Sequence, residues 1–243
     1  MHLPDLNWQF WYSRLAWGIV LASLLVALWP RRFALSRGAI GLIVLGMVAL
    51  QALPGAASPT YWLVLACQSP SGFLAGLCLA RLYQYRYSGR AHAVMTPTLA
   101  GVIAGFGALL YLDAIGLLSA GVYYWGFSPY APPALALLLA AGSAAALARG
   151  QFGPQAFALL LALMGFSILR LPTGNIWDAL LDPLLWGWAL ALLARQALRR
   201  WKNKRRLQAS TAPAPVREPD LEHEGIVGAA AVAGAIQLKH FEE

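Results

Sequence analysis

The sequence predicts an all-α, polytopic membrane protein with about seven transmembrane helices. Of its 243 residues, 59% are hydrophobic and only 12% are charged, whereas a soluble globular domain carries about 25% charged residues. Apolar runs of about 15 to 20 residues recur along the chain, close to the ~20 that a helix needs to cross a bilayer. Ten Trp, nine Tyr and nine Phe residues fit the aromatic belts found at membrane–water interfaces.

Seven apolar segments are predicted to cross the membrane. They comprise residues 10–29, 38–53, 60–80, 95–120, 134–148, 154–169 and 175–194. Several are shorter than the ~20 residues of a usual span, so flanking Trp, Tyr and Arg side chains must complete them by reaching the interface.

The distribution of positive charge predicts the orientation of these segments, because connections rich in Lys and Arg stay in the cytoplasm. The second connection (PGAASP) and the fourth (GVYYWGFSPYAPP) carry no charge. The first, third and fifth connections and the C-terminal flank are basic, through Arg31, Arg32 and Arg37, then Arg81, Arg86 and Arg90, then Arg149, and finally RQALRRWKNKRR. The N-terminus is therefore expected outside the cell and the C-terminus in the cytoplasm.

The chain is expected to divide into a transmembrane domain, residues 1–206, and a cytoplasmic tail, residues 207–243, that is largely disordered. The domain holds 16 Lys/Arg and 4 Asp/Glu, a net charge of +12, whereas the tail holds 2 and 6, a net charge of −4. The stretch STAPAPVREPDLEHE is rich in Pro, Ala and acid, a composition that does not support a packed core. The basic excess belongs to the membrane domain, which indicates anionic lipid headgroups as partners and not nucleic acid.

The third span contains a sequence that interrupts a helix, LACQSPSGFLAGL at residues 65–77. Pro70 has no N–H group to donate, the hydroxyls of Ser69 and Ser71 can bond freed backbone groups, and Gly72 and Gly76 allow a neighbouring helix to approach. Broken backbone at membrane depth is tolerated only where it is buried in protein or faces a wet cavity. The sequence therefore predicts a pocket at this break.

Ionisable residues inside the predicted spans are further candidates, since each is costly unless it is paired or faces water. Asp113, in the outer half of the fourth span, is expected either to pair with Arg170 at the end of the sixth or to contact a substrate. The expected binding region is an outward-opening cavity near Gln68, Ser71, Asp113 and Arg170.

Asp178 and Asp182, at the start of the seventh span, are also binding candidates, although helix capping competes with that role. Asn175 followed three residues later by Asp178 resembles a capping box. Asp182 precedes Pro183 and can cap a helix that restarts there.

No motif of a soluble enzyme is present, and no catalytic residue is assigned. HExxH, CxxC, a Walker glycine–lysine run and GxSxG are all missing from the sequence. The four histidines lie outside the predicted spans, so no metal site and no cofactor are expected. Ser69 and Ser71 have no His or Lys near them in the sequence, which favours helix relief over nucleophilic catalysis.

Several segments carry a resemblance to a known family. SRLAWG at residues 13–18 resembles an arginine–aromatic–glycine start of a first span, and QSPSGFLAGL is similar to an SFHGGLLGxL element. LYQYRYSG followed by MTPTLAGVIAGFG resembles a basic loop and its following helix. AIGLLSAGVYYWG stands in the place of a GRxGNFxNGE signature and APPALALLL in that of HPTQLYEAL, while GPQAFALLLALMGFSILR is similar to PGQLFALYLLLYGLLRF.

These segments resemble the prolipoprotein diacylglyceryl transferases, bacterial inner-membrane enzymes that transfer a diacylglyceryl group from phosphatidylglycerol to a lipoprotein cysteine. The departures fall on the polar signature residues. Ser71 replaces the family histidine, Arg170 lies two places from the span-six arginine position at Ile168, and the polar HPTQLYE set is reduced to Pro132. The GRxGNFxNGE positions are occupied by Leu117, Ala120, Tyr123 and Trp125.

The resemblance implies an inner-membrane protein that binds phospholipid, phosphatidylglycerol in the first place, or a lipoprotein, with altered or lost catalysis. One alternative is an active phosphatidylglycerol–prolipoprotein diacylglyceryl transferase that uses Arg170 and the outer carboxylates. A second alternative is a structural or assembly subunit, whose partner protein would stay bound when Asp113 or Arg170 is replaced by Ala.

Overall fold

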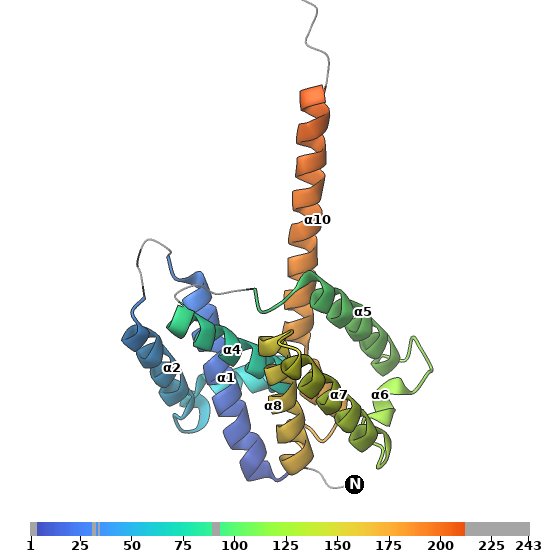
Figure 1. Ribbon diagram of the computed structural model, residues 1–243. Coiled ribbons are helices and arrows are strands. Elements are labelled where there is room, and N and C mark those ends of the chain that lie inside the picture. The colour runs from blue at the N-terminus through green and yellow to red at the C-terminus, as the bar shows by residue number, and fades with distance from the viewer. Residues whose placement is uncertain (1–3, 31–32, 34, 89–92, 212–243) are drawn as a thin grey trace, which may run out of the picture. The chain divides into compact units, whose positions relative to one another are not determined.

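The elements of the computed structural model, which describes residues 4–30, 33, 35–88 and 93–211, are all helical (Figure 1). This confirms the predicted all-α class. The helices are α1 (Leu6–Leu28), α2 (Arg37–Gln51), η1 (Gly55–Ala57), α3 (Pro59–Cys67), α4 (Gly72–Ser88), α5 (Pro97–Ala114), α6 (Val122–Trp125), α7 (Ala131–Ala148), α8 (Gly153–Leu169), α9 (Ile176–Leu180) and α10 (Pro183–Thr211). The chain divides inside α10 into two compact units, Met1–Ala197 and Leu198–Glu243.

Three of the described helices, α1, α5 and α7, are long and apolar enough to cross a membrane, and α2 and α8 are apolar but shorter. The other two predicted spans are each broken: residues 60–80 fall into α3 and α4, and residues 175–194 into α9 and α10. The predicted positive charges at Arg31, Arg32 and Arg90, and most of the tail, lie outside the described residues.

The predicted span 95–120 is wrong at its C-terminal end, because α5 stops at Ala114. Gly116 takes a φ of +79°, a conformation that suits glycine and ends helices. The N–H groups of Leu117 and Leu118 turn back to the carbonyl of Leu112. The residues of this turn are hydrophobic like those of the helix, so apolar composition alone does not show where the helix ends.

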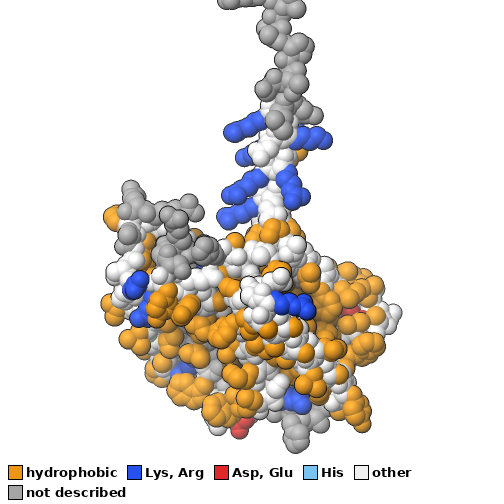
Figure 2. Space-filling view, in the orientation of Figure 1, with side chains coloured by type: hydrophobic (Ala, Val, Ile, Leu, Met, Phe, Trp, Pro, Cys, Tyr) orange, Lys and Arg blue, Asp and Glu red, His pale blue; other side chains and the backbone are white. Residues whose placement is uncertain are grey.

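Large hydrophobic side chains are exposed around the first unit, as expected where lipid is the solvent. Figure 2 shows orange side chains over most of the visible face of this unit. Leu42, Leu137 and Ile168 are each at least 70% exposed. A soluble monomer rarely exposes contiguous apolar surface on this scale, so the helices are those of a membrane protein.

Helix α4 lies at the centre of the first unit and packs against α8 and α1. Gly76 and Gly72 allow the close approach to α8 that the sequence predicts. A Cβ atom on Gly76 would stand 2.8 Å from the Cα of Ala158, and one on Gly72 would stand 3.0 Å from the Cα of Ala162. Leu74, Leu77 and Cys78 extend the same helix into the main hydrophobic core, which also takes in residues of α5, α8 and α10.

Replacing Gly76 by Val should destabilise the protein, because the added side chain would meet the backbone of α8. Overpacking of this kind costs about 1–3 kcal/mol. Thermal unfolding in detergent should show a clear fall in Tm for Gly76→Val. Gly165→Val on α8 is the control, since a Cβ atom there meets nothing within 4 Å. Equal losses in the two variants would contradict close α4–α8 packing.

Candidate functional site

The break between α3 and α4 is an ordered, strained turn. Gln68 ends α3 with φ 61° and ψ −167°, a region that is essentially restricted to glycine and costs a side-chain-bearing residue of order 1–3 kcal/mol. Pro70 and Ser71 are fully buried. The N–H of Leu74 donates to the Ser71 hydroxyl over 3.1 Å, so Ser71 caps α4. Its hydroxyl is engaged in this cap, which agrees with the predicted role in helix relief.

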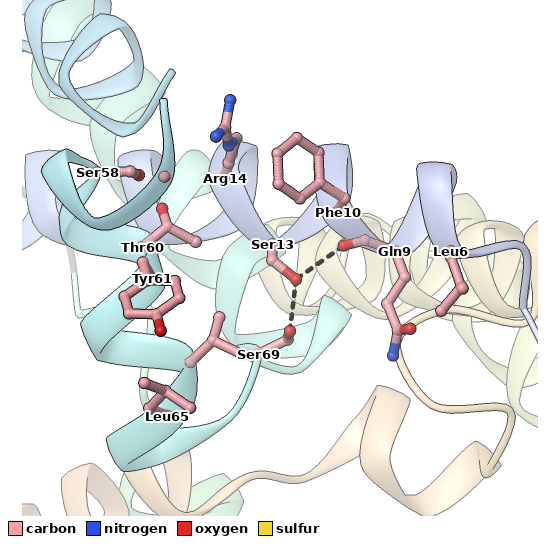
Figure 3. A pocket seen from close by; sticks show the side chains of 12 residues that line it. Leu6, Gln9, Phe10, Ser13, Arg14, Ser58, Thr60, Tyr61, Leu65 and Ser69 are labelled. Carbon is pink, nitrogen blue, oxygen red and sulfur yellow. Dashed lines mark hydrogen bonds between the residues drawn. The ribbon is translucent and has the colours of Figure 1, made fainter. Parts of the chain in front are cut away.

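Side chains of α1 satisfy the polar groups that the break leaves free. The Tyr12 hydroxyl donates to the carbonyl of Pro70 over 2.7 Å, and the Trp17 indole N–H donates to the carbonyl of Gln68 over 3.1 Å. The hydroxyls of Ser13 and Ser69 share a hydrogen bond of 2.6 Å (Figure 3). Unpaired carbonyls at this depth would cost free energy, so α1 and the break form one structural unit.

Asp182 joins this break to the second one, between α9 and α10. One of its carboxylate oxygens accepts the N–H groups of Leu184 and Leu185, both over 2.8 Å, and so caps α10. The other oxygen accepts the N–H of Ser71 over 2.7 Å. The predicted helix restart at Pro183 is confirmed, and the same carboxylate also holds the start of α4. Asp182 is buried and faces the positive dipole ends of two helices.

Asp178 accepts hydrogen bonds from two hydroxyl groups, one from the loop between α8 and α9 and one from the short helix α6. Thr173 donates to Oδ2 over 2.5 Å, and Tyr123 donates to Oδ1 over 3.2 Å. Burial, and then the charge of Asp178, raise the pKa of Tyr123 to about 12, so the phenol keeps its proton at neutral pH. Asn175 caps α9 through the N–H of Trp177. Only one half of the predicted capping box is present. Asp178 does not bond back to the N–H of Asn175, and accepts from these two hydroxyls instead.

The two breaks line a cavity of about 330 Å³, which we call the junction cavity. Gln68 and Ser69 come from the first break, Asp182 from the second, and Tyr123 and Asp178 from the segments beside it. The hydroxyl of Tyr111, also in the wall, is buried without a hydrogen-bond partner. No Lys or Arg is among the described residues that line this cavity. Its polar groups include carboxylates, hydroxyls and the amide of Gln68.

Asp113 and Arg170 are not in the wall of the junction cavity. Of the two alternatives for Asp113, pairing with Arg170 is wrong, because backbone N–H groups occupy its carboxylate. The Asp113 carboxylate accepts the N–H groups of Ala120, Gly121 and Tyr123 over 2.8–3.0 Å. It thereby fixes the loop that presents Tyr123. Arg170 ends α8 with φ 56°, and its guanidinium lies 5.2 Å from the ring centroid of Phe166.

A second cavity, of about 420 Å³, lies between α1 and α3, and we call it the α1–α3 cavity (Figure 3). Its polar lining includes Gln9, Ser13, Arg14 and Thr60, and its apolar lining comprises Leu6, Phe10, Val64 and Leu65. Ser69 lines both cavities.

Arg14 is the one cation among the described residues of the α1–α3 cavity, and no acidic side chain is among them. It donates to the carbonyls of Ala52 and Leu53 at the end of α2, over 3.1 and 2.9 Å. Its guanidinium lies 3.9 Å from the ring centroid of Phe10. Two of five guanidinium N–H groups are used, so others are available to a ligand.

The α1 residues were not among the sequence candidates, although the sequence holds a signal for them. Gln9, Ser13 and Trp17 are spaced four residues apart, and Tyr12 lies beside them on the same side of the helix. A polar stripe on a span of this hydropathy indicates a buried polar partner. The spacing of these residues along the sequence does not identify the segment that supplies the partner.

Compared with protein-family models, with curated proteins and with solved structures, the chain has no match. Its function is therefore inferred from the geometry described above.

Replacing Asp182 by Ala should be strongly destabilising, because it removes the cap of α10 and leaves the buried Ser71 N–H without a partner. A lost cap costs about 1 kcal/mol, and an unsatisfied buried group adds about 1–3 kcal/mol. Asp5→Ala is a matched control, since Asp5 caps α1 through the N–H of Asn7 in an exposed position. Thermal unfolding in detergent should show a much larger fall in Tm for Asp182→Ala. Similar falls in the two variants would show that the link to Ser71 contributes nothing.

Proposed function

We propose that the chain is a bacterial inner-membrane protein with seven membrane-crossing segments, an external N-terminus and a cytoplasmic C-terminus, and that it binds a phospholipid with an anionic headgroup. Phosphatidylglycerol is the first candidate. In this proposal the three long apolar helices, the two shorter ones and the two broken segments are the seven crossings. The scaffold would be similar to that of a diacylglyceryl transferase with altered or lost catalysis.

The observation that carries this proposal is the composition of the α1–α3 cavity. Arg14 supplies a positive charge with no acid beside it among the lining residues, and hydroxyl and amide side chains line the same cavity. Guanidinium groups bind phosphate with charge-assisted, geometrically specific hydrogen bonds. The apolar residues Leu65 and Val64 in the same wall suit the glyceryl and acyl part of the ligand. An amphiphile with one anionic end matches this pairing.

The junction cavity supports the loss of diacylglyceryl transfer. Transfer requires cationic as well as hydrogen-bonding groups that stabilise developing negative charge, and this cavity presents Asp178 and Asp182 with no cation in its described wall. The hydroxyl of Ser71, which stands in the place of the family histidine, is buried and bonded to Leu74. Arg170 does not line either cavity.

Replacing Arg14 by Gln should weaken binding of phosphatidylglycerol to the purified protein roughly tenfold or more, since a hydrogen bond to a charged group is worth about 1.5–3 kcal/mol. Native mass spectrometry of lipid adducts would measure the change. Arg14→Lys, which keeps the charge, should retain part of the affinity. Arg149→Gln, a change at an exposed arginine outside both cavity walls, is the control. Undiminished binding by Arg14→Gln would contradict the assigned site.

Expression in bacteria depleted of their own prolipoprotein diacylglyceryl transferase tests the loss of catalysis. We expect prolipoprotein to remain unmodified, because the described wall of the junction cavity has no cation to stabilise the developing negative charge. Detection of the protein in the membrane fraction is the necessary control. Restored modification would instead establish the active transferase.

A further inference from the structure

The part of α10 in the second unit carries a dense group of cations. Residues 198–206, which we call the basic segment, read LRRWKNKRR and contain six Lys or Arg and no acid. All nine residues are exposed. Figure 2 shows blue side chains gathered along this part of the chain. Basic composition alone would fit any polyanion, so the arrangement of the apolar residues decides between partners.

An apolar edge runs through the basic segment with cations on both sides. Leu198 and Trp201, about half exposed at 51% and 49%, are three residues apart and so share one helix face. Lys202 follows Leu198 by four residues and Lys204 follows Trp201 by three, which places a cation beside each apolar side chain. Arg205 lies over the Trp201 ring at 3.8 Å from its centroid.

We propose that the basic segment binds the surface of an anionic lipid membrane, with Leu198 and Trp201 in the headgroup layer and the flanking cations on lipid phosphates. Trp is enriched at membrane interfaces, and interfacial helices combine an apolar edge with Lys and Arg whose long stems reach outward to the phosphates. The apolar run LLWGWALALLA, residues 184–194, ends three residues before the segment, so the membrane surface is within its reach. This site is separate from the α1–α3 cavity and does not depend on the function proposed for it.

The test is hydrogen–deuterium exchange of the full-length protein in nanodiscs of neutral phosphatidylcholine and in nanodiscs that also contain anionic phosphatidylglycerol. We expect backbone exchange in the basic segment to slow about tenfold in the anionic nanodiscs, and the effect to disappear near 1 M salt, where the Debye length is about 3 Å. Exchange in α5 serves as the internal reference for an intact fold. Equal exchange of the segment in both lipids would overturn the proposal.

Two matched variants separate charge from other effects. Replacing Arg199, Arg200, Lys202 and Lys204 together by Gln should abolish the lipid-dependent slowing. Exchanging Arg for Lys and Lys for Arg at the same four positions keeps the charge and should preserve it. Trp201→Ser should reduce the slowing severalfold, since it removes the apolar anchor. Loss of the effect in the charge-preserving variant, or stronger protection by added RNA in neutral nanodiscs than by anionic lipid, would overturn the assignment to a membrane.

Discussion

The buried carboxylate of Asp182 is the contact on which the centre of this protein depends. It accepts backbone N–H groups from the start of α10 and from Ser71 at the start of α4. Two helical segments that are each broken are thereby joined at their breaks. Since backbone polar groups cannot find water in the hydrocarbon core, such breaks persist only if the protein supplies their partners. Asp182 supplies them on one side of the first break, and Tyr12 and Trp17 of α1 supply them on the other.

The cavities follow from this arrangement. A continuous helix through residues 59–88 would satisfy all of its backbone hydrogen bonds internally. The polar side chains of α1 would then find no free backbone group to bond. The break instead places Ser69 in the wall of both cavities. It also separates two kinds of polar surface. The α1–α3 cavity holds the guanidinium of Arg14, whereas the junction cavity holds the carboxylates of Asp178 and Asp182. The charge of the first would attract an anionic headgroup and that of the second would repel it, which is why the proposed lipid site is assigned to α1 and α3.

Local features of this fold could be predicted from the sequence, and contacts between distant segments could not. Pro70 indicated the break, Pro183 after Asp182 indicated the helix restart, and Gly72 and Gly76 indicated a close helix neighbour. Each of these depends on residues a few positions apart. The predicted alternative in which Asp113 pairs with Arg170 was wrong, because a carboxylate can be satisfied by neighbouring backbone N–H groups as well as by a cation. The bond from Ser71 to Asp182 joins residues 111 positions apart, and spacing carries no information on such a contact.

The central claim is that contacts with Asp182 and α1, and not Pro70 alone, keep the backbone of residues 68–71 non-helical. Backbone chemical shifts of residues 66–73, measured by NMR on selectively labelled Pro70→Ala protein, test it most directly. If Asp182 and α1 hold the break, Gln68 to Ser71 will keep non-helical shifts and the Ser71 amide will stay protected from exchange. Helical shifts running without interruption from α3 into α4 would show that proline alone caused the break, and would contradict the account.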